Sequence, residues 1–280
     1  MAQEGGCCGS AQWSGFRADK TGREPELICR STGIALRIAP FSRTSHMVTW
    51  LTPDHGLLTT VVKGSQRPKS AFLGQYDLFY LCEILFYSRE RNGVHVLKEA
   101  SAVDTRGGLR GNWKATACVS YFSELAARTC HPGGESAEMF DLLDRTIAFA
   151  TGHKPDLALV CWFELQAMEA LGFAPRLEAC TACGRKRPEA GERFNFAFDG
   201  GGVICRACSA SRPGILLVEL ESEALAALRF LQAEPDPVEN GEPPTTDRHM
   251  LSILNLLGRF MEHHATGAMA AREVALELLQ

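Results

Sequence analysis

Four cysteines stand in two CxxC pairs, Cys180–Cys183 and Cys205–Cys208, with 21 residues between the pairs. Both sulfur atoms of a CxxC turn can face one point, and two such turns supply the thiolates that surround a tetrahedral Zn²⁺ at about 2.3 Å. Four thiolates fill the coordination shell and leave no position for water or substrate, so the ion would stabilise the fold and perform no chemistry. The spacing therefore predicts one structural Zn²⁺ with the ligands Cys180, Cys183, Cys205 and Cys208. The alternatives are two disulfides or four unrelated buried thiols.

A second group of residues that could bind a ligand lies in Val62–Ser70, a loop that we expect to join two strands. Lys63, Arg67 and Lys69 could each neutralise a backbone phosphate, and the small residues Gly64 and Ser65 would let the chain approach it closely. The GxxxxGK[ST] order of a Walker loop is absent, which argues against nucleotide binding of that kind. The loop therefore indicates contact with a nucleic-acid backbone.

Further cations and aromatic residues stand close to this loop in the sequence. Arg37 and Arg43 could extend the cationic surface. Trp50, Phe72 and Tyr76 could stack on unpaired bases, a contact that does not depend on sequence. The alternative is that the loop is basic for solubility and that the aromatic rings fill a hydrophobic core.

The sequence shows no pattern typical of a catalytic centre. Its eight histidines are scattered, and none stands in an HExxH or HxE context. No GxSxG elbow is present, and Cys161 lies in an apolar stretch without a nearby cation to lower its pKa. We therefore predict a protein without a turnover site.

The composition is that of an ordinary globular protein: of 280 residues, 45% are hydrophobic and 22% are charged. No run approaches the ~18 apolar residues of a membrane span, and Met1–Pro25 lacks the apolar core of a secretory signal. We expect a cytoplasmic protein, associated with the nucleoid, that makes no contact with a membrane. Residues 1–26, which include Cys7 and Cys8, are predicted to form a disordered leader.

Charge is distributed unevenly along the chain. Residues 26–105 hold nine basic and seven acidic side chains, whereas residues 213–280 hold four basic and eleven acidic ones. An anionic partner is therefore expected at the N-terminal half.

The elements that must position these residues begin with a β-rich unit. Short segments rich in β-branched and aromatic residues alternate with turn signals. They predict strands at Gly33–Ala39, Ser45–Leu51, Leu57–Val62, Tyr76–Ser88 and Gly93–Ala102, the last two joined by a turn at Arg91-Asn92-Gly93. Five strands in a meander predict a barrel of the OB type.

After Gly111 the apolar period changes from two to 3.6 residues, which predicts helices. The packed face of the first helix would be formed by Trp113, Ala117, Tyr121 (or Phe122) and Leu125, and that of the second by Met139, Leu142, Leu143, Thr146 and Phe149. A third helix would run from Pro155 to Gly172. Three more helices are expected at Ser222–Gln232, Asp247–His264 and Ala270–Leu279, with an acidic, proline-rich linker, 234–244, before the last two.

These segments predict an α+β multidomain chain in which a five-stranded OB-fold barrel is followed by a helical bundle with a four-cysteine zinc-binding insert. The boundaries that we expect are a leader at 1–26, an OB-fold nucleic-acid-binding domain at 27–106, a helical bundle at 112–177, the four-cysteine segment at 178–212 and C-terminal helices at 213–280.

In this order of parts the chain resembles the bacterial RecO family of DNA repair proteins, over roughly residues 27–232. The resemblance is carried by Gly33–Gly56, by the loop Val62–Ser70, by Tyr121–Leu125 with Phe140–Leu143, and by the run Phe163–Gly184 that leads from the bundle into the first cysteine pair. The last run is the most specific, because it joins the bundle and the cysteines in the family's own order.

The resemblance implies a recombination mediator of the RecF pathway and not an enzyme. RecO-like proteins bind single- and double-stranded DNA, anneal complementary strands, contact the C-terminal tail of the single-strand-binding protein, and act with RecR to load RecA. The residues carried over to the DNA face of the barrel are Arg37, Arg43, Lys63, Arg67 and Lys69, with Trp50 and Tyr76 as stacking residues. For the acidic tail, we expect a basic, apolar groove near Trp162, Arg176 and Arg185.

The chain also departs from the family pattern. Ala71 and Leu73 replace further basic residues after the loop, and the region after Pro213 is acidic. A protein-interaction scaffold whose barrel never touches DNA is the alternative function, and an enzyme with a structural zinc ion is a third.

Overall fold

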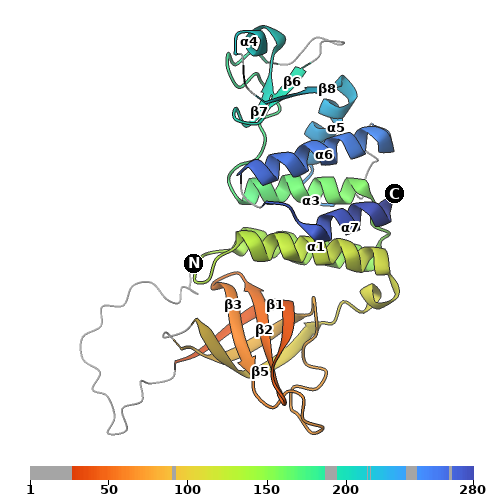
Figure 1. Cartoon of the computed structure of the whole chain (residues 1–280). Helices are drawn as coiled ribbons and strands as arrows, with labels where there is room; N and C mark the ends of the chain where they lie inside the picture. The colour runs from red at the N-terminus through yellow and green to blue at the C-terminus, as the bar shows by residue number, and fades with distance from the viewer. Residues whose placement is uncertain are drawn as a thin grey trace, which may run out of the picture.

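The computed structural model describes residues 27–89, 93–186, 194–212, 214, 216–237, 245–264 and 267–280. In these residues a β-barrel, a helical bundle and a small three-stranded sheet follow one another along an elongated molecule (Figure 1). The leader with Cys7 and Cys8, the predicted turn residues Arg91 and Asn92, and the 238–244 part of the predicted linker lie outside the described residues.

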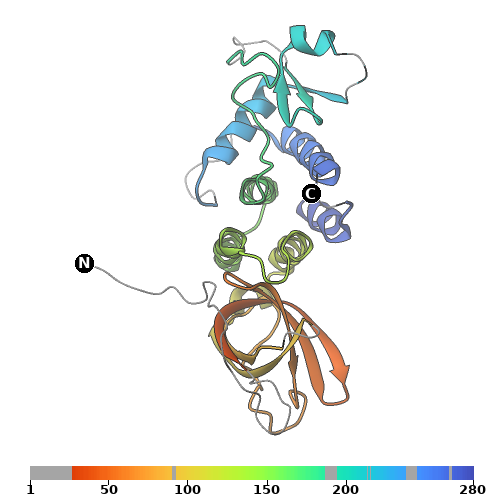
Figure 2. The ribbon, with the colours of Figure 1, turned by 90° about the vertical axis from the view of Figure 1, so that its left-hand side faces the viewer.

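The barrel is a closed five-stranded sheet in the order β1-β2-β3-β5-β4, and Figure 2 looks into it along its axis. Its strands are β1 (Ile28–Ser42), β2 (Ser45–Thr52), β3 (Gly56–Val62), β4 (Leu81–Tyr87) and β5 (Val94–Asp104). The predicted meander is wrong at one step, because β3 pairs with β5 in parallel and not with β4. This mixed order with its single parallel pair is that of an OB-fold.

Strand β1 is longer than the sequence indicates because two neighbours share it. Its first half pairs with β4 and its second half with β2, so the strand curves around the barrel and closes it. Pro40, which cannot donate to a ladder, stands at an irregularity of the β1–β2 pairing. Strand β4, in contrast, begins five residues later than predicted, because Tyr76–Tyr80 belongs to a loop in which Phe79 has a φ of 67°.

The helices lie where the 3.6-residue period predicts them. The bundle contains α1 (Trp113–Thr129), α2 (Ala137–Gly152), α3 (Leu157–Ala170), α5 (Ser222–Ala233), α6 (Asp247–His264) and α7 (Ala270–Leu279), and a 3₁₀ turn, η1 (Gly107–Gly111), leads into α1. None of the helices in the described ranges has the length and apolar composition needed to cross a membrane.

The packed face of α1 differs from the predicted one. Tyr121, its alternative Phe122 and Leu125 are all buried, but the buried stripe continues through Ala115 and Cys118, while Trp113 is 61% exposed. At 100° per residue, Trp113 stands opposite Phe122 on the helix. The prediction for this residue is therefore wrong.

Helix α3 occupies the centre of the bundle and is buried nearly all round. In Figure 2 it lies between the pair α1 and α2 on the barrel side and the helices α5 and α6 on the other, while α7 packs beside it on α1. A helix without a polar face is typical of such a position. It explains why most of its side chains, among them Trp162 and Phe163, are fully buried.

One charged group nevertheless lies inside the bundle. Glu164 of α3 is completely buried, and Arg272 of α7 binds both of its carboxylate oxygens, at 2.7 and 3.0 Å. Tyr121 donates a further hydrogen bond to Glu164, and Arg272 also donates to the carbonyl oxygen of Leu254 in α6. This network joins α1, α3, α6 and α7 through one ion pair.

The barrel docks on the bundle through backbone contacts. Leu57 donates to the carbonyl oxygen of His131 at 3.2 Å, Gly133 to that of His55 at 2.9 Å, and Ser136 to that of Pro53 at 3.1 Å. The β2–β3 turn therefore lies against the α1–α2 loop. Gly56 makes this approach possible: its φ is +59°, and a Cβ atom would lie 2.2 Å from the carbonyl oxygen of His131.

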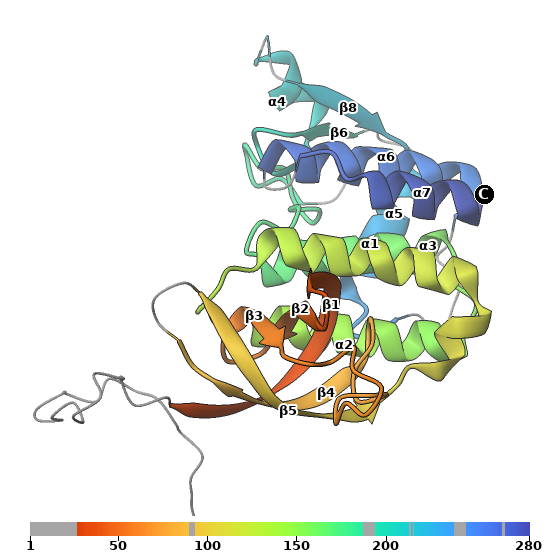
Figure 3. The same cartoon turned by 60° about the horizontal axis from the view of Figure 1, so that its bottom comes forward.

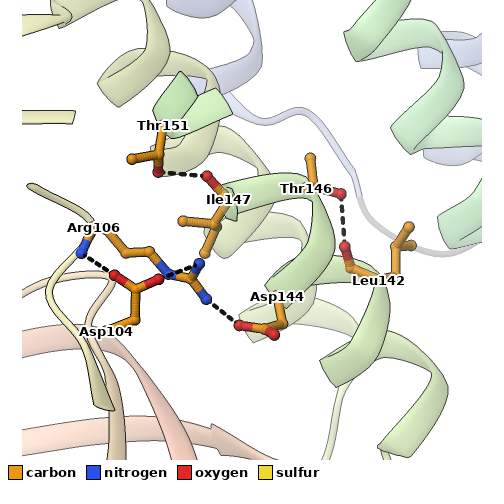
Figure 4. Close-up of polar contacts among 7 residues, drawn as sticks. All are labelled: Asp104, Arg106, Leu142, Asp144, Thr146, Ile147 and Thr151. Atoms are coloured by element: carbon orange, nitrogen blue, oxygen red, sulfur yellow. Dashed lines mark hydrogen bonds and ion pairs between the residues drawn. The ribbon is translucent and has the colours of Figure 1, made fainter. Parts of the chain in front are cut away.

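A buried arginine fixes the chain where it leaves the barrel. Arg106 has a φ of 50° and forms ion pairs with Asp104 at the end of β5 and with Asp144 of α2 (Figure 4). Burial raises the pKa of Asp144, and the positive charge of Arg106 only partly offsets that effect. The contact joins the barrel strand to the first layer of the bundle.

Candidate metal centre and nucleic-acid interface

The four cysteines of the two pairs converge on one point. Their sulfur atoms all lie within 4.8 Å of one another, and the Sγ atoms of Cys183 and Cys205 are 3.9 Å apart. A tetrahedron with metal–sulfur bonds of about 2.3 Å has edges of about 3.8 Å. None of the four forms a disulfide, so the disulfide alternative is excluded for them. The donor set fits a tetrahedral thiophilic ion such as Zn²⁺.

Local structure explains how each pair turns its sulfur atoms inward. In the first pair, Gly184 donates to the carbonyl oxygen of Cys180 with a φ of +71°, and the backbone N–H of Cys180 donates to Arg185. In the second pair, Cys205 caps the short helix α4 (Arg206–Ala210) and Cys208 lies within it. The tight turn of the first pair therefore faces the beginning of α4, which carries the second pair, as in paired zinc knuckles.

The four thiols also influence one another's ionisation. Burial opposes the ionisation of Cys180, but hydrogen bonds from the backbone of Cys205, Cys183 and Ala182 outweigh it and lower its pKa to about 6. The pKa of Cys208 is raised to about 12 by hydrogen bonds with Cys205 and Cys183 and by the charge on Cys180. Four thiolates at this separation repel one another, and a divalent ion removes that repulsion.

The cysteine segment is attached to the bundle by aromatic residues. Its sheet has the order β7-β6-β8, with β6 (Phe194–Ala197), β7 (Gly202–Ile204) and β8 (Leu217–Leu220). Phe196 and Phe198 pack on each other and on Phe260 of α6, and His264 lies 3.3 Å from the carbonyl oxygen of Phe198. A metal ion at the cysteines would therefore stabilise the end of α6 as well.

At the other end of the molecule, the predicted basic loop is fixed against the β1–β2 hairpin. Gly64 donates to the Ser45 hydroxyl at 3.2 Å, His46 to the Ser65 hydroxyl at 3.1 Å, and Gln66 to the carbonyl oxygen of Thr44 at 3.2 Å. Gly64 has a φ of +70°, which lets the chain turn immediately after β3. The hairpin and the loop therefore form one connected surface.

This surface, which we call the cationic edge, carries five exposed basic residues. The structure places them on the β1–β2 hairpin or on the loop that packs against it: Arg37, Arg43, Lys63, Arg67 and Lys69. Within the described residues none of the five forms an ion pair with an acidic side chain. Their charges remain available to an external anion.

The predicted stacking residues differ in their exposure. Trp50 is fully buried in the barrel core, where its indole N–H donates to Thr60 at 2.9 Å, so this ring is not available for stacking in the folded barrel. Tyr76 and Phe72 are half-buried, and Tyr76 is hydrogen-bonded to His46 at 2.8 Å. Burial raises the pKa of Tyr76, which keeps the phenol protonated.

Sequence reasoning missed two residues of the cationic edge. Phe41 is 56% exposed near the tip of the β1–β2 hairpin, two residues before Arg43, and Leu73 is 71% exposed in the loop. The signal that could have found Phe41 is its position between Pro40 and the turn, where an aromatic side chain cannot fill the barrel.

The cysteine that the sequence analysis considered as a nucleophile is not activated. Cys161 is fully buried in α3, and burial raises its pKa well above the ordinary value, which makes the thiol inert. Trp162 is also buried and donates to the carbonyl oxygen of Glu234 at 2.9 Å. The expected groove for an acidic tail near Trp162 is therefore not open at that residue.

Two family models match the chain. Residues 27–106 match the model "Recombination protein O N terminal", and residues 110–273 match the model "Recombination protein O C terminal".

Similar proteins described as "DNA repair protein RecO" include that of Anaeromyxobacter dehalogenans (strain 2CP-C), which is 30% identical over 247 residues, or 88% of this chain and 95% of that protein. The protein of Anaeromyxobacter sp. (strain Fw109-5) is 31% identical over 86% of this chain and 93% of its own length. That of Rhodopirellula baltica is 29% identical over 76% of each chain. With its barrel, bundle and four-cysteine cluster, this chain belongs to the RecO family of DNA repair and recombination proteins.

Proposed function

We propose that this protein is a recombination mediator without enzymatic turnover. It binds single- and double-stranded DNA at the barrel, anneals complementary strands, and acts with RecR to load RecA onto DNA covered by the single-strand-binding protein, in the bacterial cytoplasm at the nucleoid. The observation that supports it most is the cationic edge: five exposed basic side chains, none paired with an acidic side chain within the described residues, on a hairpin and loop that also expose the ring of Phe41. Contacts to phosphates and stacked bases are independent of sequence, as annealing requires.

The experiment is a salt titration of DNA binding with Lys63→Ala plus Arg67→Ala. Each phosphate cation removed should lower affinity for all sequences alike and reduce the slope of log affinity against log salt by about one unit. Arg30→Ala is the matched control, because this barrel cation is already paired with Glu83 at 2.6 Å. Unchanged affinity and salt slope in the double variant would show that the cationic edge is not the DNA face.

The four cysteines are proposed to hold one structural Zn²⁺ that stabilises the small sheet. The division of the chain into an OB-fold domain at 27–106, a bundle at 112–177, a zinc segment at 178–212 and C-terminal helices at 213–280 is part of the same proposal.

An acidic tail of the single-strand-binding protein would fit a groove on α6. The groove has a volume of about 650 Å³ and is lined by apolar residues, Val218, Leu251 and Leu256, and by the exposed arginines Arg248 and Arg259. Within the described residues Arg248 has no acidic partner, and Arg259 lies over the ring of Phe198 at 5.0 Å. Two cations beside an apolar floor suit a peptide that is both acidic and apolar.

The test is binding of a labelled tail peptide to Arg248→Ala plus Arg259→Ala. We expect weaker peptide binding and unchanged affinity for naked DNA, because the groove and the cationic edge lie at opposite ends of the molecule (Figure 1). If this variant bound the peptide as tightly as the wild-type protein, the groove on α6 would not be the peptide site.

A further inference from the structure

Trp113 is the exposed tryptophan of the described chain. Trp50 and Trp162 are fully buried, whereas Trp113 is 61% exposed at the beginning of α1. The buried stripe of α1 runs along the other side of the helix, so Trp113 contributes nothing to the core of the bundle. A large apolar ring that a fold leaves in water is a common feature of binding surfaces.

One cation lies near this ring, and a second stands three residues before it in the chain. The ammonium group of Lys114 lies 5.7 Å from the centre of the Trp113 ring. Arg110, in the 3₁₀ turn η1, donates a hydrogen bond to the Tyr80 hydroxyl and lies 5.9 Å from the centre of the Tyr80 ring. The acidic side chain nearest to Arg110 is that of Asp77, at 4.0 Å, and both side chains are largely exposed. Such an exposed, distant pair is weak, so the guanidinium group can turn to an external phosphate.

The patch of Arg110, Trp113 and Lys114 continues the cationic edge. The loop between β3 and β4 begins with the basic residues Lys63, Arg67 and Lys69 and ends at Tyr80, which binds Arg110. Figure 3 shows how the chain leaves the barrel after β5 and passes through η1 into the beginning of α1. One loop therefore leads from the cationic edge to Arg110, which stands three residues before the exposed tryptophan.

We propose that Trp113, with Arg110 and Lys114, forms a second contact for single-stranded DNA, in which an unpaired base stacks on the indole and the cations bind the neighbouring phosphates. The proposal rests on the proposed DNA binding of the barrel and extends it to the bundle. An aromatic ring with flanking cations is the usual combination for unpaired bases. Bases in a duplex are stacked on one another, so this contact favours single strands.

Tryptophan fluorescence tests the stacking directly. In a Trp13→Phe background, titration with an oligothymidylate long enough to cover both surfaces should quench the emission of Trp113, because the two buried indoles cannot reach a base. The quenching should disappear in Trp113→Phe, although this variant still binds DNA. Quenching that persists in Trp113→Phe would contradict the assignment.

Affinity measurements separate stacking from other effects. Trp113→Ala should lower the affinity for oligothymidylate by about 5- to 150-fold, which corresponds to the loss of one base–aromatic stack, and leave affinity for a blunt duplex unchanged. Lys114→Ala should reduce the salt slope by about one unit. Val274→Ala is the control, because it truncates an apolar side chain that is 50% exposed on α7. Thermal unfolding checks that each variant is folded.

The outcomes are distinguishable. If the wild-type protein binds oligothymidylate without a change in Trp113 emission, and Trp113→Ala binds as tightly, the inference fails while the proposed function stands. If the wild-type protein binds no DNA at low salt, both fail. An equal loss of single- and double-strand affinity in Trp113→Ala, or quenching by RecR but not by DNA, would assign Trp113 to another contact and overturn the inference.

Discussion

At the scale of single residues, the bundle depends on a carboxylate that water never reaches. Burying a charge is costly unless it is paired and its hydrogen bonds are satisfied. Glu164 meets both conditions, because Arg272 and Tyr121 bind its two oxygens. Burial alone would lower the pKa of Arg272, but the charge of Glu164 more than offsets this and raises it. The guanidinium group of Arg272 therefore stays charged in the folded bundle.

Glu164→Gln should be among the most damaging substitutions in the bundle. It leaves the guanidinium group of Arg272 buried opposite a neutral amide, and loss of one partner of a buried pair costs about 3 to 5 kcal/mol of unfolding free energy. Urea unfolding measures the change. Glu124→Gln is the control, because it breaks a solvent-exposed pair with Arg128 on α1, for which about 0 to 1 kcal/mol is expected. Equal losses in the two variants would contradict the role assigned to the network.

At the scale of elements, the helices could be predicted from the sequence and the order of the strands could not. Two of the last three helices, Asp247–His264 and Ala270–Leu279, have the predicted bounds, because their apolar period is a local property. The pairing of β3 with β5 depends on contacts between segments far apart in the chain, and no local signal specifies it. The five basic residues of the cationic edge could likewise be identified in the sequence. Their arrangement on one surface could not, because it depends on the hydrogen bonds that the Ser45 and Ser65 hydroxyls accept.

The burial of individual aromatic side chains could not be predicted from the residue pattern either. Trp50 and Trp113 are both aromatic residues in amphipathic stretches, yet the first is fully buried and the second is exposed. Tertiary packing decides which side chains fill a small barrel and which face a helix turns toward its neighbours. The four cysteines were predictable for the opposite reason, since the geometry of a metal shell restricts their spacing.

The four-cysteine segment supplies a prediction at this scale. Cys180→Ser removes one ligand and should abolish stoichiometric zinc, and the loss should destabilise the small sheet together with the end of α6 that its phenylalanines contact. Zinc content and thermal unfolding, with and without chelator, measure both effects. Cys118→Ser is the control, because this buried thiol lies in α1, outside the cluster.

The DNA affinity of the cationic edge should survive in Cys180→Ser, since that surface lies in the barrel. A variant that kept zinc and full thermal stability but lost annealing would show that the cysteines do more than stabilise the fold.

At the scale of the whole molecule, the two proposed binding surfaces lie at opposite ends. The cationic edge belongs to the barrel, and the groove on α6 lies beside the small sheet (Figure 1). A DNA strand and an acidic peptide therefore do not compete for one surface, and the protein can hold both at once. The bundle between them must keep the two surfaces in a fixed relation, and its joint with the barrel is formed by the turn at Gly56 and by Arg106.

Gly56→Ala should loosen this joint. Its Cβ atom would lie 2.2 Å from the carbonyl oxygen of His131, and a positive φ adds strain for any residue with a side chain. Gly133→Ala is the matched control, with a φ of +74° and no atom within 4 Å of the added Cβ. Both variants carry the strain, of about 1 kcal/mol, but only Gly56→Ala should lower the unfolding temperature further and expose the joint to hydrogen exchange. Equal effects would mean that the close approach is unimportant.

The central position of α3 also affects how the chain is made. The helix has few polar side chains and is buried nearly all round, and part of its covering, α6, begins 77 residues after α3 ends. At about 5 to 20 residues per second, a ribosome needs roughly 4 to 15 s to deliver that covering. During this interval the nascent chain exposes one of its most hydrophobic helices, which makes it a substrate for chaperones before it becomes a partner of DNA.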